Sequence, residues 1–367
     1  MEGTVYDRLM THFSTLGMGY PPRDVFLDIL RENFSPEEAE VLLLLPTRVA
    51  PLQTVSAAEA ARSGGLDAAS VAEMLDRVAD RNLIYRGKTA AGEVGYGLLQ
   101  VGFGFPQTFF WKGEDTPHAR KMNQLIGKYF SREVTQDSYG SSETKPYRYV
   151  PVEQTIQKDK QAVYPLHAME TVIAGATSFA VAHCPCRVSM RLRDRPCEHP
   201  EEVCLKFDEM AEYAIERELA RRITRDEARE IIRLSAREGL VHFVDNAGSG
   251  VKHNCNCCGC ACWSVGTIRR RKVPRDTLMA TYFLRETDPD RCTGCGDCVE
   301  ICPVQAVTAE HGRVAVDLEW CIGCGVCATR CGFDACAMIH REDRGEVPGE
   351  FGALHRDILR EKATEPE

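Results

Sequence analysis

Cysteine is absent before Cys184 and after Cys336, although this chain of 367 residues contains 18 cysteines. A segment without thiols cannot hold a thiolate-bound metal, so the first half of the chain must do something else. A chain of this length exceeds what one hydrophobic core usually organises, and we expect two or three domains. Its 44% hydrophobic and 27% charged residues are typical of an ordinary folded protein, neither disordered nor fibrous.

The N-terminal sequence, MEGTVYDRLMTHF, lacks the charged-then-apolar pattern of a secretory signal and the arginine pair of twin-arginine export. No segment reaches the roughly 18 uninterrupted apolar residues that a membrane-spanning helix needs. We therefore expect a cytoplasmic protein that does not insert into a membrane. Thiols stay reduced in the cytosol, so clustered cysteines there usually hold metal.

Several common catalytic and nucleotide-binding signatures are also absent. The sequence has no Gly-rich dinucleotide fingerprint after a strand, no P-loop and no nucleophile elbow. A net charge of −9 disfavours a protein that coats nucleic acid or an anionic membrane. The sequence therefore predicts no substrate pocket of its own, and it favours a non-catalytic component over an enzyme.

Residues 35–102 carry a recognisable order of elements. A capping box between Ser35 and Glu38 starts a helix in SPEEAEVLLLL. Two more helices are predicted in VSAAEAARSGG and in DAASVAEMLDRVADRNL, where Asp67 is a suitable N-cap. IYRGKTAAGEVGYGLLQV then predicts two short strands around a Gly-rich turn. This order of helices and hairpin resembles the winged-helix family.

In DNA-binding winged helices, the third helix enters the major groove and carries basic residues. Here that helix sets Arg77 and Arg81 against the acidic residues Asp67, Glu73, Asp76 and Asp80. Phosphates repel an acidic face, so nucleic-acid binding is disfavoured. We expect a docking or dimerising module instead, through which the chain forms a homo-oligomer or meets a partner.

The next segment marks a domain boundary. The aromatic run GFGFPQTFFW is interpreted as core, with a partner surface as the alternative. TQDSYGSSETKPYRYVPVEQ is rich in Ser, Thr, Gly and Pro and is typical of a linker. We therefore assign residues 1–135 to the winged-helix-like domain and residues 136–165 to the linker.

Two copies of the spacing C-x2-C-x2-C-x3-C lie near the C-terminus, in CTGCGDCVEICP from Cys292 and in CIGCGVCATRC from Cys321. Over residues 286–340 the chain closely resembles bacterial two-cluster ferredoxins, in which the fourth cysteine of each copy ligates the other cluster. The resemblance implies one [4Fe-4S] cluster on Cys292, Cys295, Cys298 and Cys331. It implies a second on Cys321, Cys324, Cys327 and Cys302.

The segment departs from the ferredoxin pattern in two places. Cys302 is followed by Pro303 but Cys331 by Gly332, which puts the turn geometry there in question but not the ligation. Cys336 stands where such ferredoxins usually have an aliphatic residue, and we interpret it as a small buried hydrophobe. A pair of zinc sites would prefer two separated C-x2-C pairs and is disfavoured.

Nine more cysteines form two groups between the linker and the ferredoxin segment. The first group, in HCPCRVSMRLRDRPCEHPEEVC, contains Cys184, Cys186, Cys197 and Cys204. The second, in NCNCCGCAC, contains Cys255, Cys257, Cys258, Cys260 and Cys262. Helices are predicted between them in HPEEVCLKFDEMAEYAIEREL and TRDEAREIIRLSAREG, the latter with a capping box from Thr224 to Glu227. We expect this helical pair to bring the two groups together around one or two further iron–sulfur clusters.

Other interpretations of this block stay open. Zinc is an alternative occupant of some of the thiols. His183 and His253 lie beside the cysteine groups and are candidate ligands, although solvated or core histidines are commoner. The basic run RRRKVPR from Arg269 can compensate cluster charge, dock an acidic partner or form a solvated turn.

Two resemblances bear on this block. The CCG at Cys257–Gly259 resembles the CCG domain of heterodisulfide reductases, which holds a non-cubane cluster, but the upstream Cys-Cys pair of that family is missing. The block is also similar to bacterial 4Fe-4S proteins that combine a winged-helix-like start, a C-x-C-R group, a CNCCGC group and a terminal two-cluster ferredoxin. That resemblance implies cluster binding over most of the chain.

The sequence thus predicts an α+β protein with a winged-helix-like N-terminal domain and a helical cysteine-rich middle block at residues 166–285. A bacterial-ferredoxin-like (βαβ)2 domain at residues 286–340 and a tail at residues 341–367 follow. The predicted function is iron–sulfur electron transfer, as a subunit or dedicated partner of a larger oxidoreductase that contains flavin or metal. The alternatives are a redox-sensing winged-helix regulator and a reductase with a catalytic cluster at the CNCCGC site.

Overall fold

The computed structural model describes residues 3–140, 142–152, 155–156 and 165–363. It divides the chain into two compact units, each built from separate stretches of sequence. Unit 1 comprises Met1–Thr144, Glu212–Arg221 and His355–Glu367, and unit 2 comprises Lys145–Ala211 and Arg222–Leu354. This division does not follow the serial domain boundaries expected from the sequence, because the chain returns to unit 1 twice.

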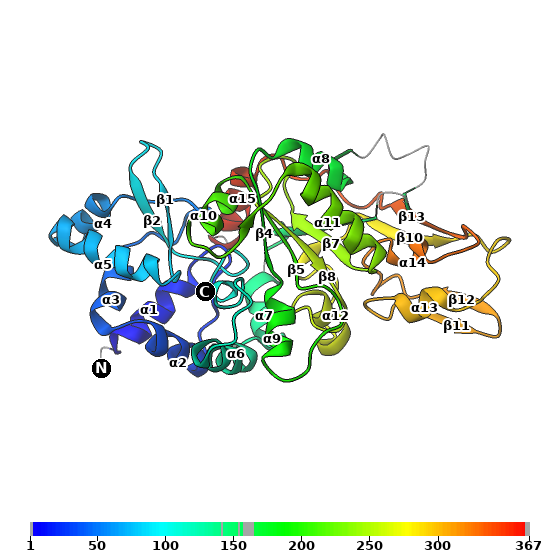
Figure 1. The fold of residues 1–367 in the computed structure, drawn as a ribbon, viewed down its shortest axis with the longest axis horizontal. Coiled ribbons are helices and arrows are strands. Elements are labelled where there is room, and N and C mark those ends of the chain that lie inside the picture. The colour runs from blue at the N-terminus through cyan, green and yellow to red at the C-terminus, as the bar shows by residue number, and fades with distance from the viewer. Residues whose placement is uncertain (1–2, 141, 153–154, 157–164, 364–367) are drawn as a thin grey trace. The chain divides into compact units, whose positions relative to one another are not determined.

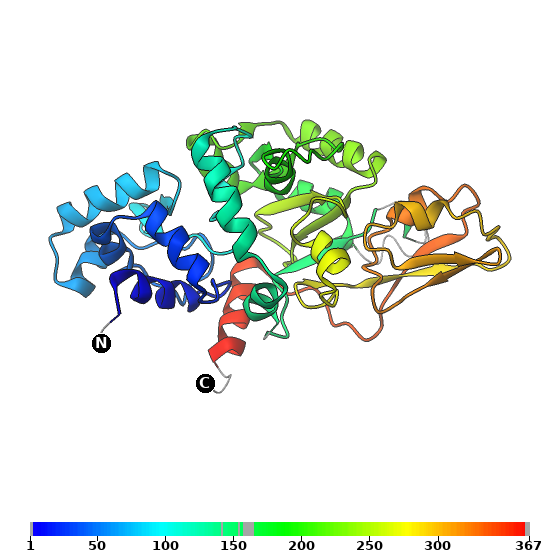
Figure 2. The same ribbon diagram turned by 90° about the horizontal axis from the view of Figure 1, so that it is seen from below.

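Unit 1 is mostly helical and has one small hairpin (Figures 1 and 2). Strands β1 and β2 pair antiparallel, and Val55 forms an isolated bridge with Tyr96 beside them. Its elements are α1 (Val5–Ser14), α2 (Asp24–Asn33), α3 (Pro36–Leu42), α4 (Ala57–Gly64), α5 (Ala68–Asp80), β1 (Tyr85–Lys88), β2 (Val94–Gly97), η1 (Gln107–Phe109), α6 (Pro117–Tyr129), α7 (Arg132–Tyr139) and, from His355 onward, α15 (Phe351–Ala363).

Local sequence signals explain the start and end of the helices in residues 35–80. The Glu38 amide donates to the Ser35 hydroxyl at 3.2 Å and the Glu38 carboxylate accepts from the Ser35 amide at 2.9 Å, so the expected capping box begins α3. Helix α4 ends at Gly65 in the left-handed region, with φ of 65°. Asp67 caps α5. The predicted order of three helices and a hairpin is therefore confirmed.

The aromatic run of residues 102–111 lies in the core of unit 1, as expected. Phe105 packs with Phe13, Tyr20 and Phe34, with ring centroids 5.7–6.4 Å apart. Trp111 is also fully buried. Such aromatic pairs contribute packing energy beyond the area that they bury. The segment therefore stabilises unit 1 and does not form an exposed partner surface.

Unit 2 is organised around a seven-stranded sheet in the order β6-β4-β5-β8-β7-β3-β9. The pairs β4–β5, β5–β8, β7–β8 and β3–β7 are antiparallel, and β3–β9 is parallel. Its strands are β3 (Tyr147–Val150), β4 (Phe179–His183), β5 (Glu202–Phe207), β6 (Arg221–Arg222), β7 (Val241–Asp245), β8 (His253–Cys257) and β9 (Met279–Ala280). The accompanying helices are η4 (Pro165–His167), α8 (Met169–Gly175), α9 (Pro185–Arg191), the first residues, up to Ala211, of α10 (Asp208–Glu216), α11 (Arg225–Arg237) and α12 (Val265–Arg271).

The expectation of a helical middle block is wrong. The segment predicted as one helix from His199 contains strand β5 followed by α10, and only α11 forms as expected, capped by Thr224 and Glu227. Every second residue of β5, from Val203 to Phe207, is buried and apolar, which suits a central strand better than a helix face. A sheet, not a helical hairpin, brings the two cysteine groups together.

Part of the expected linker also belongs to this sheet. Strand β3 lies within residues 136–165 and pairs with β7 over four residues. Residues 141, 153–154 and 157–164 of that segment lie outside the described residues.

The two faces of the sheet differ in chemistry. Helices α8 and α11 cover one face, where Leu205 and Val244 belong to their hydrophobic core (Figure 1). Because neighbouring residues of a strand point to opposite faces, Cys204 on β5 and Cys255 on β8 share the other face. The alternation in His253–Cys257 thus places asparagines on the core side and cysteines on the opposite side.

The ferredoxin segment has the order strand, helix, strand, strand, helix, strand. Strand β10 pairs antiparallel with β13, and β11 pairs antiparallel with β12. The elements are β10 (Phe283–Thr287), α13 (Asp297–Ile301), β11 (Val307–Glu310), β12 (Arg313–Val316), α14 (Val326–Thr329) and β13 (Cys336–His340). This is the doubled strand–helix–strand order that the ferredoxin resemblance implies.

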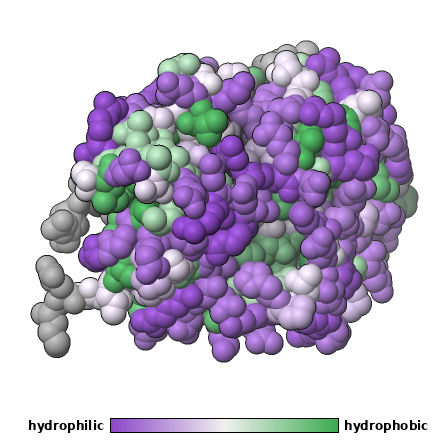
Figure 3. Space-filling view, turned by 60° about the vertical axis from the view of Figure 1, so that its left-hand side comes forward, coloured by the Kyte–Doolittle hydropathy of each residue, from purple (hydrophilic) through white to green (hydrophobic). Residues whose placement is uncertain are grey.

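No helix among the described residues is long and apolar enough to span a membrane. The face of the molecule in Figure 3 is mostly hydrophilic, with hydrophobic side chains scattered across it.

Candidate metal centres

The eight cysteines of the ferredoxin segment line two separate cavities. Four of them line the first cavity, which we call the inner cavity: Cys302, Cys321, Cys324 and Cys327. The other four line the second cavity, which we call the outer cavity: Cys292, Cys295, Cys298 and Cys331. Each cavity therefore takes three cysteines from one sequence repeat and the fourth from the other. The division matches the two ligand sets that the ferredoxin resemblance implies.

The turns after the two fourth cysteines have the same geometry. The Ala306 amide donates to Cys302 Sγ at 3.2 Å, and the Ala335 amide donates to Cys331 Sγ at 3.3 Å. Each turn also contains a residue with positive φ, Gln305 at 57° and Asp334 at 49°. The absence of proline after Cys331 therefore leaves this turn unchanged, which resolves the question raised by Gly332.

The two cavities differ in their access to solvent. All four cysteines of the inner cavity are buried, whereas Cys295 of the outer cavity is exposed. Burial raises the pKa of Cys327 to about 12, and burial likewise raises the pKa values of Cys302 and Cys324. Thiols in such an environment ionise readily only when a metal takes the proton's place. The inner cavity is thus shielded from solvent, whereas the outer cavity is open to solvent at Cys295.

A buried arginine lies between the two cavities. Arg285 lines both of them and is 4% exposed. Its Nε donates to Thr287 Oγ1 at 3.1 Å. Although burial lowers the pKa of Arg285, the Cys327 thiolate and a hydrogen bond with Cys298 raise it above its ordinary value. Arg285 therefore keeps its positive charge beside both ligand sets. The cysteine spacing gives no indication of it.

Cys336 also lines the outer cavity, which the sequence interpretation as a buried hydrophobe did not anticipate. It is partly buried, and burial raises its pKa to about 12. A hydrogen bond joins its thiol to Cys331. The outer cavity therefore contains five thiols, one more than a [4Fe-4S] cluster uses.

In the middle block, six of the nine cysteines form one connected set, which we call the six-thiol group. Each thiol affects the pKa of the next in the order Cys184, Cys186, Cys262, Cys257, Cys255 and Cys204, so neighbours in this order lie close together. Strands β5 and β8 supply three of them, and α9 with the residue before it supplies two. The loop before α12 supplies the last. These thiols come from four parts of the chain that only the sheet brings together.

Amides and a buried cation stabilise negative charge in the six-thiol group. Backbone amides of Ser264 and Val265 donate to Cys262 Sγ, each at 3.3 Å. The neighbouring thiols of Cys186 and Cys257, together with these amides, hold the pKa of Cys262 well below its usual value. Lys206 is 2% exposed, and its Nζ donates to Cys204 Sγ at 3.3 Å. A buried ammonium needs an anionic partner, so this group is built to carry thiolates.

The remaining three cysteines form a second set, which we call the three-thiol group: Cys197, Cys258 and Cys260. Cys197 Sγ lies 3.7 Å from Cys258 Sγ and 3.4 Å from Cys260 Sγ. All three sulfur atoms lie within 4.8 Å of one another. Cys258 is buried, Cys197 is partly buried and Cys260 is exposed. The three-thiol group therefore lies at the surface, with one side open.

Arg187 lies between the two thiol groups. It is 1% exposed, and its Nη2 donates to the Asn256 carbonyl at 2.9 Å. Burial lowers its pKa, but the Cys184 and Cys258 thiolates raise it above its ordinary value. A hydrogen bond from Cys260 lowers the pKa of Cys258 to about 4. The buried guanidinium thus compensates thiolate charge on both sides.

The six-thiol group lies next to the inner cavity. Tyr149 on β3 is 2% exposed, and burial together with the thiolates of Cys262, Cys324 and Cys257 raises its pKa. Its phenol is therefore close to cysteines of both sites. Three residues after Tyr149, the Val152 amide donates to the Cys324 carbonyl at 3.1 Å. The inner cavity thus lies beside the sheet of the middle block.

The two candidate histidine ligands lie apart from the compact three-thiol set. His253 is buried, and its Nδ1 lies 2.9 Å from a carboxylate oxygen of Asp245. His183 at the end of β4 is partly buried. Among the described residues, the group of ligand atoms within 4.8 Å of one another contains cysteines only. The structure therefore supports cysteine and not histidine as the ligand at that site.

The basic run at residues 269–275 secures the cysteine loops. Arg270 donates to the carbonyls of Gly259 at 3.1 Å and Cys262 at 2.9 Å. Arg275 donates to the Cys321 carbonyl at 3.0 Å. These bonds to backbone carbonyls are a structural role that none of the three interpretations left open by the sequence had included.

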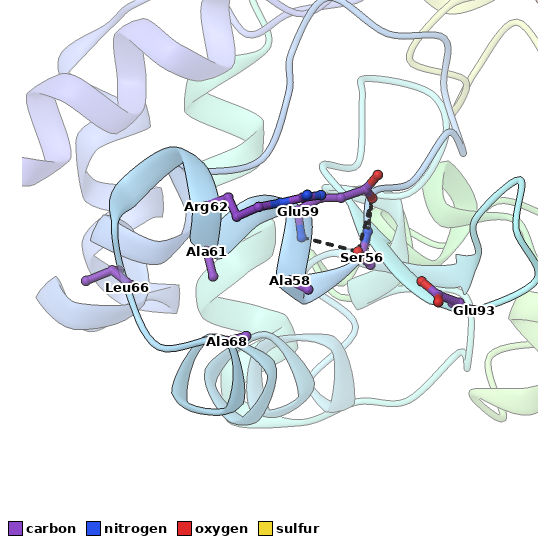
Figure 4. A pocket seen from close by; sticks show the side chains of 8 residues that line it. All are labelled: Ser56, Ala58, Glu59, Ala61, Arg62, Leu66, Ala68 and Glu93. Carbon is purple, nitrogen blue, oxygen red and sulfur yellow. Dashed lines mark hydrogen bonds between the residues drawn. The ribbon is translucent and has the colours of Figure 1, made fainter.

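A hollow of about 420 Å³ in unit 1 has no cysteine or histidine among its lining residues. Figure 4 shows Ser56, Glu59 and Arg62 around it, with the Glu59 carboxylate turned to Ser56. That carboxylate accepts from the Ser56 amide at 2.8 Å as part of a capping box. The Glu59 carboxylate is therefore part of the N-terminal cap of α4.

Comparison with known proteins agrees with the geometry of the ferredoxin segment. Residues 285–332 match the family model of a 4Fe-4S dicluster domain. The search of curated proteins and the search of solved structures found no match to this chain. The chain therefore carries an iron–sulfur dicluster domain at residues 285–332. Together with the cysteine groups of the middle block, this domain supports a role in iron–sulfur electron transfer.

Proposed function

We propose that this protein relays electrons through three iron–sulfur clusters, as a subunit or dedicated partner of a larger oxidoreductase. Two [4Fe-4S] clusters would occupy the ferredoxin segment, one on Cys302, Cys321, Cys324 and Cys327, and one on Cys292, Cys295, Cys298 and Cys331. A third cluster would be held by cysteines of the six-thiol group. Clusters of this kind transfer single electrons, and the protein sets their potentials and positions.

The observation that carries this proposal is the close approach of the cysteine-rich loop of the middle block to the inner cavity, where a Cβ atom on Gly259 would stand 2.1 Å from the carbonyl oxygen of Pro303. In agreement, burial and the nearby Cys262, Cys324 and Cys257, which belong to both sites, raise the pKa of Tyr149. Electron transfer slows steeply with distance, so clusters in these two neighbouring sites would exchange electrons rapidly. The bond from Val152 to Cys324 fixes this spacing through the backbone.

The exposure of the cysteines gives the relay a direction. Cys295 makes the outer cavity the most accessible of the three sites, so a soluble donor or acceptor would meet the protein there. Electrons would pass through the buried inner cluster to the six-thiol group. Arg285 beside the first two clusters would stabilise their reduced, more negative states.

Unit 1 would provide the docking module. Its elements from α3 to β2 have the order of a winged helix, and the isolated bridge of Val55 adds a short third strand. On α5, Asp76 pairs with Arg86, and Asp80 pairs with Arg217. Arg86 and Arg217 beside this helix therefore each pair with a carboxylate within unit 1. A protein contact, with a partner or a second copy, suits this surface better than a nucleic-acid contact.

The first test is the content of iron and acid-labile sulfide in the anaerobically purified full chain. Three cubanes correspond to about 12 irons per chain. Replacing Cys257 with Ser should remove about four irons, whereas Cys260→Ser, outside the six-thiol group, should remove none. About eight irons in the wild type, unchanged in Cys257→Ser, would overturn the third cluster.

A second measurement tests the relay itself. In the fully reduced wild type, electron paramagnetic resonance should show magnetic interaction between the inner cluster and the third cluster. This interaction should disappear in Cys257→Ser while the signals of the two ferredoxin clusters persist. Three independent signals without interaction in the wild type would contradict the placement of the clusters side by side.

A further inference from the structure

The three-thiol group differs in geometry from every other cysteine set in the described part of the chain. Among the described residues, it is the group of three potential metal ligands whose ligand atoms, here three sulfur atoms, all lie within 4.8 Å of one another. The eight cysteines around the inner and outer cavities do not meet this criterion, although they line their cavities in fours. This difference in spacing distinguishes a site for a single metal ion from a site for a multi-iron cluster.

Thiolates on a cubane bind four different irons, so their sulfur atoms are spread apart by the cluster. Thiolates on a single ion are closer together. For tetrahedral zinc with Zn–S bonds of about 2.3 Å, the sulfur atoms stand about 3.8 Å apart. The distances from Cys197 Sγ, 3.7 Å to Cys258 and 3.4 Å to Cys260, are close to this value. They are far longer than the roughly 2.05 Å of a disulfide bond.

The surroundings of the three-thiol group also suit a single dication. Three thiolates with Zn²⁺ leave one negative charge, and the buried guanidinium of Arg187 beside Cys258 compensates it. The Ala261 amide donates to Cys258 Sγ at 3.4 Å. Arg270 holds the carbonyls of Gly259 and Cys262 and thereby fixes the loop that carries two of the ligands. Such contacts orient ligands and balance charge at metal sites.

A fourth protein ligand is missing from the set. Among the described residues, no histidine, aspartate or glutamate, and no further cysteine, joins the three sulfur atoms within 4.8 Å of all of them. Cys260 is exposed, so solvent reaches the site. Three protein ligands with an open position are typical of catalytic zinc, whereas structural zinc usually has four.

We propose that Cys197, Cys258 and Cys260 bind one Zn²⁺ ion in a mononuclear site, separate from the iron–sulfur clusters, with a fourth position that water or an external thiolate occupies. Soft thiolate ligands select zinc over harder ions. An external thiol that binds there loses its proton to solvent and becomes a zinc-bound thiolate, with no change in oxidation state. The site does not depend on the proposed relay, because it shares none of its cysteines.

Metal analysis of the full chain tests the site. Wild-type protein purified anaerobically with zinc present should contain about one zinc ion per chain. Cys197→Ser and Cys258→Ser should each lower zinc at least about tenfold while iron and sulfide stay unchanged. The matched control Cys255→Ser, in the six-thiol group, should keep its zinc and lose iron. Because the ferredoxin clusters remain visible in every variant, a folding defect would be detected.

Zinc X-ray absorption tests the open position. The wild type should show three sulfur ligands and one lighter atom, and excess 2-mercaptoethanol as the probe should convert this to four sulfurs. Four sulfurs before the thiol is added would overturn the open position. Loss of iron and sulfide instead of zinc in Cys197→Ser would overturn the zinc site and assign these cysteines to a cluster. Retention of three clusters with no zinc in the wild type would overturn the zinc site and leave the relay intact.

Discussion

Gly259 and Pro303 approach each other so closely that a Cβ atom on Gly259 would stand 2.1 Å from the Pro303 carbonyl oxygen. Gly259 belongs to the cysteine-rich loop of the middle block, and Pro303 directly follows Cys302 of the inner cavity. Only glycine permits this approach. The contact therefore fixes the distance between the loop of the middle block and a ligand turn of the ferredoxin segment.

Gly259→Ala should destabilise the protein by about 1–3 kcal/mol, because a backbone atom cannot yield to the added methyl group. It should also weaken the magnetic interaction between the inner cluster and the third cluster. The matched control is Gly332→Ala, since a Cβ there meets nothing within 4 Å. Equal stability and equal spectra for the two variants, measured by denaturant unfolding and paramagnetic resonance, would refute the role of this contact.

The outer cavity offers a test of which thiols bind iron. Cys331 and Cys336 both line it. Cys331 Sγ accepts a hydrogen bond from the backbone amide four residues later in the chain, as Cys302 Sγ does in the inner cavity. We expect Cys331→Ser to lose about four irons and the outer cluster signal, and Cys336→Ser to lose neither. Iron and sulfide analysis decides between them. Full iron content in Cys331→Ser would show that Cys336 can take its place.

Arg285→Gln should lower the reduction potentials of both ferredoxin clusters. Removing a buried positive charge disfavours the more negative reduced state, by on the order of 1 kcal/mol or about 40–60 mV for each one-electron cluster. The control is Arg291→Gln, because Arg291 is 53% exposed in its ion pair with Asp334 and solvent screens its charge. Redox titrations measure these potentials. If Arg285→Gln changed the reduction potential of one cluster alone, or of neither, the position of Arg285 beside both clusters would be contradicted.

A buried histidine should make stability depend on pH. Burial, with the charges of Arg148 and His340, lowers the pKa of His167 to about 3, and its ring packs 4.8 Å from that of Tyr282. In the unfolded chain the pKa of histidine is about 6.5. Between these values the unfolded state binds the proton and the folded state does not. The free energy of unfolding therefore falls as the pH drops below about 6.5, by up to about 1.4 kcal/mol per pH unit.

His167→Phe keeps an aromatic ring in this packing and removes the titration. Its free energy of unfolding should fall less steeply than that of the wild type between about pH 6.5 and 5, with a difference of about 2 kcal/mol at the lower end. The exposed His118 provides the control variant His118→Gln. Parallel curves for wild type and His167→Phe would mean that His167 is already protonated in the folded protein.

The local features of this protein were predictable because neighbouring residues produce them. The capping box of Ser35 and Glu38 and the cap at Asp67 begin helices regardless of what lies beyond them. The spacing of cysteines and glycines in residues 292–331 forms ligand loops in the same way, and the match to a 4Fe-4S dicluster domain agrees with that reading. Short-range geometry therefore sufficed for α3 to α5 and for the character of the C-terminal domain.

The middle block was not predictable in this way. The segment around Cys204 contains good helix formers, and only its pairing with β4 and β8 makes it a strand. Tertiary context overrides local propensity in such central strands. The error mattered, because a helical hairpin and a sheet bring different thiols together.

The sequence by itself indicated an iron–sulfur dicluster domain, because the four-cysteine repeats set out their pattern over a few neighbouring residues. Only the tertiary structure decided how the other nine cysteines divide into six and three. That division depends on the register of β5 against β8 and on a loop that returns Cys197 to Cys258, and neither is a local property. It likewise placed Arg285 in the lining of both cavities and Gly259 against Pro303, because long-range packing decides which distant segments lie side by side.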